Sequence, residues 1–198
     1  MARRIFPRIG FFAAVALMLA GTSALARPVH IVAFGDSATK GWLVPSKDAY
    51  PAQLQALLRK KGYDVVVDNA GLSGDTTAGA LRRFDSAIGP GTDIVLVEFG
   101  TNDLRMHVPA KRMRANLNEI IQTLRKRRIE VLLIGLGSLH LADVARENRV
   151  PYAQWTLPRG QYRARDHQHF NAEGYAILIA RMLPQVEALI RQVEAVQR

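Results

Sequence analysis

The sequence predicts an α/β fold built on a parallel sheet, because short β-branched runs alternate with longer amphipathic stretches along most of its 198 residues. These runs are almost wholly apolar, as expected of strands that are covered on both faces. A polar segment containing glycine follows directly after each of the first three runs. In an open parallel sheet, ligands bind outside the carboxyl ends of the strands, so these segments mark the expected site.

Four strands and five helices are expected along the chain. The strands are predicted over residues 29–34, 63–68, 93–99 and 130–136, and the helices over residues 49–61, 76–88, 110–128, 139–148 and 171–196. Gly62 ends the first helix. Pro184 is expected to kink or split the last helix, because proline lacks the N–H that a helix interior uses.

The first 26 residues have the pattern of an export signal. Arg3, Arg4 and Arg8 form a positive start, residues 9–20 are almost wholly apolar, and residues 24–26 (ALA) have the small-x-small pattern that signal peptidase cleaves. We therefore expect a signal peptide over residues 1–26, one domain over residues 27–198, and a periplasmic or secreted location. The alternative is an uncleaved anchor, although the apolar run is shorter than the roughly 18 residues that a spanning helix requires.

Basic residues outnumber acidic ones. The formal net charge is +10, and because the leader holds three arginines and no acid, the remainder carries 24 basic and 17 acidic residues, a charge of +7. This balance suggests an anionic membrane or cell-wall surface as a partner. Nucleic acid is not expected, because the clusters at 59–61 and 125–128 lie at predicted helix ends and have no interleaved aromatic residues. With no cysteine, the chain has no disulfide framework.

Ser37 is the candidate nucleophile, in the Gly-Asp-Ser turn at residues 35–37 where the chain leaves the first strand. A serine hydroxyl is a weak nucleophile until a neighbouring base takes its proton. Asp166 and His169 have the spacing that lets a carboxylate fix the tautomer of an imidazole, so that Nε2 faces the serine. The alternative is an ordinary turn, since these three residue types are common in turns. His167 is expected to be a surface histidine.

An oxyanion that forms on the substrate requires fixed hydrogen-bond donors. We expect these to be the backbone N–H groups of Ser37 and Gly71 and the side-chain amide of Asn102, which follow the first three strands. Taken singly, Gly71 is equally consistent with a loop glycine and Asn102 with a turn cap.

Four segments, FGDSATKGW, NAGLSGDTTAGALRRF, VEFGTNDLR and DHQHFNAEGYAIL, resemble the blocks of the SGNH, or GDSL-type, serine hydrolases. The resemblance is closest to the secreted arylesterase, thioesterase and lysophospholipase branch and spans nearly the whole chain after the leader. It implies a flavodoxin-like three-layer α/β/α sandwich with a doubly wound parallel sheet. It also implies the roles given above for Ser37, Asp166 and His169 and for Gly71 and Asn102, with Asp75 and Asp103 structural.

The chain departs from the family pattern in two places. Phe170 stands where the last block usually has proline, and residues 138–149 form a shorter segment than in the thioesterase-like relatives, without their aromatic-rich acyl-binding segment. Substrate choice is therefore the least determined property. We expect a shallow acyl pocket lined by Leu72, Leu104 and Met106, with Trp155 and Phe170 at its rim.

The sequence thus predicts an exported esterase that hydrolyses acyl or aryl esters through an acyl-enzyme, and the resemblance implies thioesters or lysophospholipids as further candidate substrates. No cofactor is expected, and no metal, because His167 and His169 lack the further ligands of a zinc site. One alternative is a carbohydrate or cell-wall O-acetylesterase of the same fold. The other is a module that binds an anionic ligand in the glycine-lined crevice without turnover.

Overall fold

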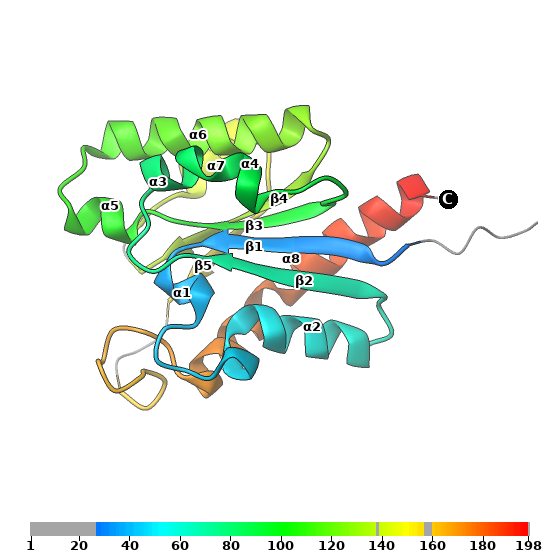
Figure 1. Cartoon of the computed structure of the whole chain (residues 1–198), viewed down its shortest axis with the longest axis horizontal. Coiled ribbons are helices and arrows are strands. Elements are labelled where there is room, and N and C mark those ends of the chain that lie inside the picture. Colours follow the sequence, from blue (N-terminus) through cyan, green and yellow to red (C-terminus); the bar gives the residue numbers. More distant parts are fainter. Residues whose placement is uncertain (1–26, 138, 157–159, 198) are drawn as a thin grey trace, which may run out of the picture.

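Five parallel strands form a single sheet in the order β2-β1-β3-β4-β5 (Figure 1). The strands are β1 (Val29–Gly35), β2 (Val65–Gly71), β3 (Ile94–Glu98), β4 (Glu130–Leu136) and β5 (Tyr152–Trp155). This computed structural model describes residues 27–137, 139–156 and 160–197, so the expected signal peptide lies outside the described residues. The strand order is the flavodoxin-like one, which confirms the predicted fold class.

Helices cover both faces of the sheet, giving three layers (Figure 1). They are α1 (Ser37–Lys40), the 3-10 turn η1 (Ser46–Asp48), α2 (Tyr50–Lys60), α3 (Thr77–Arg82), α4 (Phe84–Ala87), α5 (Thr101–Arg105), α6 (Ala110–Lys126), α7 (Ala142–Asn148) and α8 (Ala172–Gln197). The helices α2 and α8 pack on one face, and α3, α4, α6 and α7 pack on the other. Within the described residues, no helix is both long and apolar enough to cross a bilayer.

Each face of the sheet has its own apolar core. On the face of α2 and α8, the ring of Tyr50 packs edge-on against Trp155, with centroids 4.8 Å apart, and Trp155 packs on Phe170 at 6.3 Å. On the other face, Phe34 packs against Phe99 at 4.9 Å. Each of these fully buried side chains stabilises the fold by about 1.5–3 kcal/mol, so the sheet is a rigid base for the loops at its edge.

The structure differs from the predicted elements in several places, and α1 and the 3-10 turn η1 are among the elements that the sequence did not predict. The strand β5 was not predicted, because four residues after a proline are too short for an alternating pattern. The helix expected over residues 76–88 is two short helices, α3 and α4, separated at Arg83, and α5 is an additional short helix. Pro184 does not split α8, which is continuous through it.

Candidate active site

Loops that follow β1, β2 and β3 meet at the carboxyl edge of the sheet, and the segment before α8 lies at the same end (Figure 1). The strands β1 and β3 are neighbours where the strand order reverses, which is where an open α/β sheet leaves a crevice. A cavity of about 510 Å³ opens here. Ser37, Asn102, Asp166 and His169 are among its lining residues.

Contacts explain the residue type at Gly35 and Asp36, the two positions before Ser37 in its turn. Gly35 is required by packing, because a Cβ there would lie 2.0 Å from the Thr39 hydroxyl and 2.7 Å from the Glu98 carbonyl oxygen. Asp36 caps α1, since its carboxylate accepts a backbone N–H of the first helical turn at 2.9 Å. Ser37 is therefore held as the first residue of a helix, with its side chain at the cavity.

A row of hydrogen bonds joins Ser37 to residues from the far end of the chain. His169 Nε2 lies 2.8 Å from Ser37 Oγ, and His169 Nδ1 lies 2.5 Å from Asp166 Oδ2. The ring is thus oriented from one side by a carboxylate and presents its other nitrogen to the hydroxyl. The structure brings together the three residues that the sequence singled out.

Local hydrogen bonds hold Asp166 in its ionised form. Burial alone raises the pKa of this carboxyl, but the hydrogen bonds from the His169 ring and from the backbone N–H groups of Gln168 and His169 outweigh it and lower the pKa to about 2. The backbone bonds measure 3.1 and 3.0 Å and both end on Asp166 Oδ1. The carboxylate is therefore negative at any pH near neutrality.

The neighbouring His167 does not take part. His167 is exposed and does not line the cavity. Its φ of +58° turns the chain between Asp166 and His169. Across the part of the chain that the structure describes, no three His, Cys, Asp or Glu side chains are grouped as a metal site.

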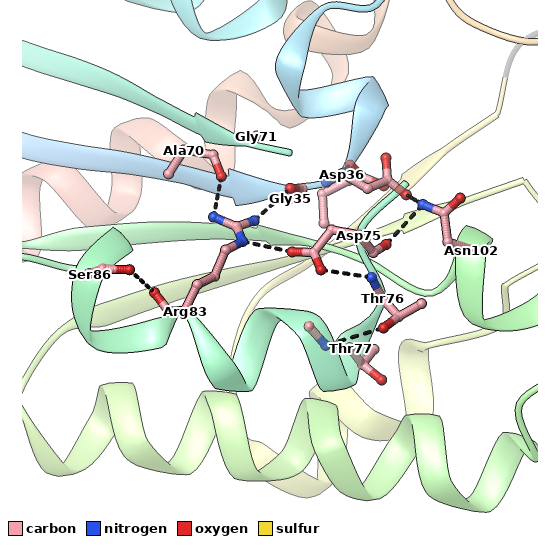
Figure 2. A network of polar contacts seen from close by, with 12 residues as sticks. Gly35, Asp36, Ala70, Gly71, Asp75, Thr76, Thr77, Arg83, Ser86 and Asn102 are labelled. Carbon is pink, nitrogen blue, oxygen red and sulfur yellow. Dashed lines mark hydrogen bonds and ion pairs between the residues drawn. The ribbon is translucent and has the colours of Figure 1, made fainter. Parts of the chain in front are cut away.

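Asn102 lies on α5, beside the serine turn, and is held by two loops at once (Figure 2). Its side-chain amide donates to Asp36 Oδ2 at 3.0 Å and to the Asp75 carbonyl oxygen at 2.9 Å. Both amide hydrogens are therefore occupied. If this amide is to donate to an oxyanion, it first has to break its hydrogen bond to Asp36 or to the Asp75 carbonyl oxygen.

The side chains of Asp75 and Asp103 brace the same loops. Arg83 donates to Asp75 Oδ2 at 2.7 Å and also to two backbone carbonyls at the ends of β2 and β1, at 2.8 and 3.0 Å (Figure 2). Asp103 accepts from the N–H and the hydroxyl of Thr77, at 2.9 and 2.6 Å. These contacts tie the loops after the first three strands together.

The expectation for Gly71 is wrong. Its N–H donates to Asn69 Oδ1 at 2.9 Å, and Gly71 does not line the cavity. Gly74, three residues further on, does line the cavity, with a φ of +80°. Within the described chain, the N–H of Gly74 has no acceptor, and neither has that of Ser37. Gly71 is the last residue of β2 and Gly74 lies in the turn that follows it, and nothing in the sequence indicates which of the two N–H groups stays without a protein acceptor.

A further carboxyl group, that of Glu98, is buried below the serine turn and is not among the residues predicted from the sequence. Glu98 is fully buried, and its Oε2 accepts from the Thr39 hydroxyl at 3.0 Å and from the Asp36 N–H at 3.4 Å. Burial and the adjacent Asp36 carboxyl raise the pKa of Glu98 well above its usual range. Burial likewise raises the pKa of Asp36. The available signal was an acidic residue inside an otherwise apolar strand.

The walls of the cavity are mixed in character. Trp42 and Met106 provide apolar surface, whereas Arg105 and Gln168 are polar and approach each other to 3.4 Å. Ser73 lies on the same wall as Gly74.

The expected acyl-pocket residues fall into three groups. Met106 lines the cavity, and Leu104 lines two neighbouring hollows, whereas Leu72 is exposed and lines none of the described cavities. The rim position of Trp155 is wrong. Trp155 is fully buried because β5 places it in the core against Tyr50. Phe170 is also buried, but it lines a hollow beside Ser37, so it remains a candidate pocket residue.

At its switch point, the flavodoxin-like sheet carries a serine, a histidine and an aspartate in one hydrogen-bonded row. This combination of fold and site defines the class of α/β proteins that have a catalytic-type cleft at the edge of the sheet. The chain belongs to the GDSL-like lipase/acylhydrolase family, whose sequence model matches residues 33–177.

Known proteins of this kind resemble the chain. An arylesterase from Vibrio mimicus is 32% identical over 105 residues, which is 52% of each protein. Esterase TesA from Pseudomonas aeruginosa is 36% identical over 124 residues, 62% of this chain and 60% of that protein. The matches therefore span about half to three-fifths of the length of these relatives. A crystal structure of TesA shares the fold, with a TM-score of 0.72 and 24% identity over 81% of this chain and 99% of that one.

Proposed function

We propose that the protein is a serine esterase that cleaves carboxylic esters through a covalent acyl-enzyme on Ser37. The observation that carries the proposal is the uninterrupted row from Ser37 Oγ through the His169 ring to Asp166, at 2.8 and 2.5 Å, open to a cavity. This geometry is what a hydroxyl nucleophile, a base and an orienting carboxylate require. Family membership and the similar arylesterase and esterase support the same activity.

In the acylation step, His169 Nε2 accepts the hydroxyl proton while Ser37 Oγ attacks the ester carbonyl carbon. Asp166, ionised because its pKa is held at about 2, stabilises the imidazolium through the Nδ1–H. The tetrahedral intermediate then collapses, the bond to the leaving oxygen breaks, and His169 donates the proton to the departing alcohol.

The oxyanion of that intermediate is placed against the backbone N–H groups of Ser37 and Gly74, which have no acceptor among the described residues. Asn102 supplies a third donor when its amide exchanges the Asp36 carboxylate or the Asp75 carbonyl for the oxyanion. Fixed donors of this kind favour the transition state over the planar ester.

Deacylation uses the same residues in reverse order. Water takes the place of the alcohol, His169 accepts its proton, and the resulting hydroxide attacks the acyl carbon. The serine oxygen leaves and recovers the proton from His169, which releases the carboxylic acid and restores the enzyme.

We propose that the acyl group lies toward Leu104 and Leu139. A hollow of about 60 Å³ beside Ser37 shares Thr101, Leu136 and Phe170 with a second hollow of about 170 Å³. That hollow in turn shares Leu104 and Leu139 with an apolar pocket of about 260 Å³. A chain of several methylene groups has apolar contacts along this series, whereas the larger and more polar cavity suits the leaving group.

We also propose that the protein is exported, on the charge and hydrophobicity pattern of residues 1–26 alone. Expression of the full chain in a bacterial host, followed by fractionation and N-terminal sequencing, tests this. A mature form that begins at Arg27 in the exported fraction is expected, and an uncleaved protein in the cytoplasm would overturn it.

The activity is tested with p-nitrophenyl esters from acetyl to palmitoyl, with acyl-CoA, a lysophospholipid and an acetylated glycan run beside them. A fluorophosphonate probe should label the protein at Ser37, and Ser37→Ala should remove both the labelling and the hydrolysis. Failure of the probe to label folded protein, together with no turnover of any ester, would favour the alternative of a binding module.

A further inference from the structure

Exposed large apolar side chains are concentrated around the cleft. In the described part of the chain they are Trp42, Leu72, Leu104, Met106 and Val196, with exposed fractions of 49, 51, 58, 62 and 87%. The first four come from the segments that follow β1, β2 and β3, and we call these four residues the apolar rim. Val196 is near the end of α8, at the opposite end of the sheet from those loops (Figure 1). Single exposed apolar residues are ordinary, but a cluster of them marks an interaction surface.

Contact with a small ester in the cleft does not account for the whole rim. Trp42 and Met106 line the main cavity, so they can touch such a substrate. Leu72 lines none of the described cavities, and Leu104 lines only the neighbouring hollows. Since more than half of each leucine is exposed, both side chains are available to a surface larger than one substrate molecule.

The exposed charges around the apolar rim are positive. The loops at residues 36–44, 71–75, 100–108 and 160–170 contain four acidic residues, Asp36, Asp75, Asp103 and Asp166. The first three are buried, and Asp166 is paired with His169. Lys40, Arg105 and Arg165 in these loops are exposed. The apolar rim is therefore flanked by cations, with no fully exposed carboxylate in these segments, in a chain that carries a formal net charge of +7 after residue 26.

We propose that the face around the cleft docks onto an anionic lipid bilayer, with the apolar rim in the headgroup region and Lys40, Arg105 and Arg165 on the lipid phosphates. Charge complementarity selects this occupant. An uncharged apolar partner gains nothing from the cations, and a soluble anionic ligand gains nothing from Leu72 and Leu104. Tryptophan is suited to the membrane interface, and each surface cation adds to the attraction of anionic lipid.

Docking does not depend on turnover, so it is measured on Ser37→Ala protein, in which no ester is cleaved. The probes are vesicles of phosphatidylcholine alone and of phosphatidylcholine with phosphatidylglycerol. Co-flotation with the anionic vesicles is expected, with much weaker binding to the neutral ones and loss of binding at about 1 M salt, where charges are screened beyond about 3 Å.

The two tryptophans of the chain supply an internal reporter. Trp155 is fully buried, so a blue shift of the emission on adding vesicles reports the environment of Trp42. The expected result is a shift with anionic vesicles only. Equal shifts with both kinds of vesicle, or none with either, would overturn the proposal whether or not the protein is an esterase.

Leu72→Ser is the decisive variant, because Leu72 is exposed and lies outside the cavities. In the Ser37→Ala background it should lower the vesicle partition coefficient about tenfold, since one leucine no longer enters the interface. Val196→Ser is the matched control and should leave the coefficient unchanged. Equal effects of the two substitutions would exclude the rim as the docking surface. So would a dimer in sedimentation that Leu72→Ser converts to a monomer, because a second copy would then cover the rim.

Discussion

The carboxyl groups of Asp36 and Glu98 lie together, buried beneath the turn that carries Ser37. Glu98 Oε2 is 3.4 Å from the Asp36 backbone N–H, and Asp36 Oδ2 in turn accepts from Asn102 at 3.0 Å. Two buried carboxylates cannot both be charged at low cost, so the raised pKa of Glu98 means that it retains its proton where a free glutamate has lost it. Glu98 thus holds the backbone of Asp36, and the Asp36 carboxylate in turn holds Asn102.

Glu98→Gln should stabilise the protein increasingly as the pH rises. Between the unfolded pKa of about 4.3 and the raised folded pKa, the folded state binds more protons than the unfolded state, so the unfolding free energy of the natural protein falls with pH. Glutamine has nearly the same shape and does not titrate. Denaturant unfolding at pH 4 and pH 8 should therefore show the variant gaining stability relative to the natural protein. The exposed Glu130, changed to Gln, is the control; a difference that is independent of pH for Glu98→Gln would mean that Glu98 is ionised in the fold.

His169→Ala should abolish ester hydrolysis, and His167→Ala should leave it within a few-fold. His169 lies 2.8 Å from Ser37 Oγ, whereas His167 is exposed and lies outside the cavity lining. Loss of the base or the nucleophile of such a row typically lowers the rate by several orders of magnitude. Steady-state kinetics with circular dichroism as a check of folding measures this. The reverse pattern would mean that the base is His167.

Gly74→Ala and Gly71→Ala should have different effects. A methyl group at Gly74 meets nothing within 4 Å, but alanine is strained at φ +80°, so we expect the N–H to turn away and kcat to fall about tenfold or more, with KM little changed. At Gly71 the methyl group would lie 2.2 Å from the Lys40 backbone nitrogen, which should lower the unfolding free energy by about 1–3 kcal/mol. Kinetics and denaturant unfolding of both variants separate the two cases. Full kcat in Gly74→Ala would remove Gly74 from the oxyanion site.

Leu104→Trp should shorten the range of acyl chains that the protein accepts. Leu104 borders both the hollow that leads away from the serine and the apolar pocket beyond it, and its exposure leaves room for a larger side chain without strain in the core. Each buried methylene group contributes about 0.8 kcal/mol, nearly fourfold in specificity. The ratio of kcat/KM for octanoyl over acetyl p-nitrophenyl ester should therefore fall, with acetyl unchanged. An unaltered ratio would place the acyl chain elsewhere.

Sequence patterns predicted the sheet well because the information is local. A buried parallel strand is a continuous apolar run, and the helices repeat their apolar residues every three or four positions, so β1 to β4 and the long helices α6 and α8 were recognised. The strand β5 was missed because four residues carry too little pattern, and its place was decided by pairing with β4. The predicted rim position of Trp155 is wrong for the same reason, because without β5 nothing in the sequence shows that this side chain enters the core.

Ser37, Asp166 and His169 could be chosen from the sequence because residue type, order and spacing identify them, and the fold brings them within 2.8 and 2.5 Å of their partners. Gly74 and Glu98 could not be chosen in that way. Whether the N–H of Gly71 or that of Gly74 stays free depends on the hydrogen bond that Gly71 donates to Asn69. Whether Glu98 is protonated depends on its burial beside Asp36. The sequence by itself thus determined the strands β1 to β4, the long helices and the side chains that we propose as the reacting ones. Tertiary structure alone decided which donors stay free and which carboxyl keeps its proton, because both depend on neighbours that are distant along the chain.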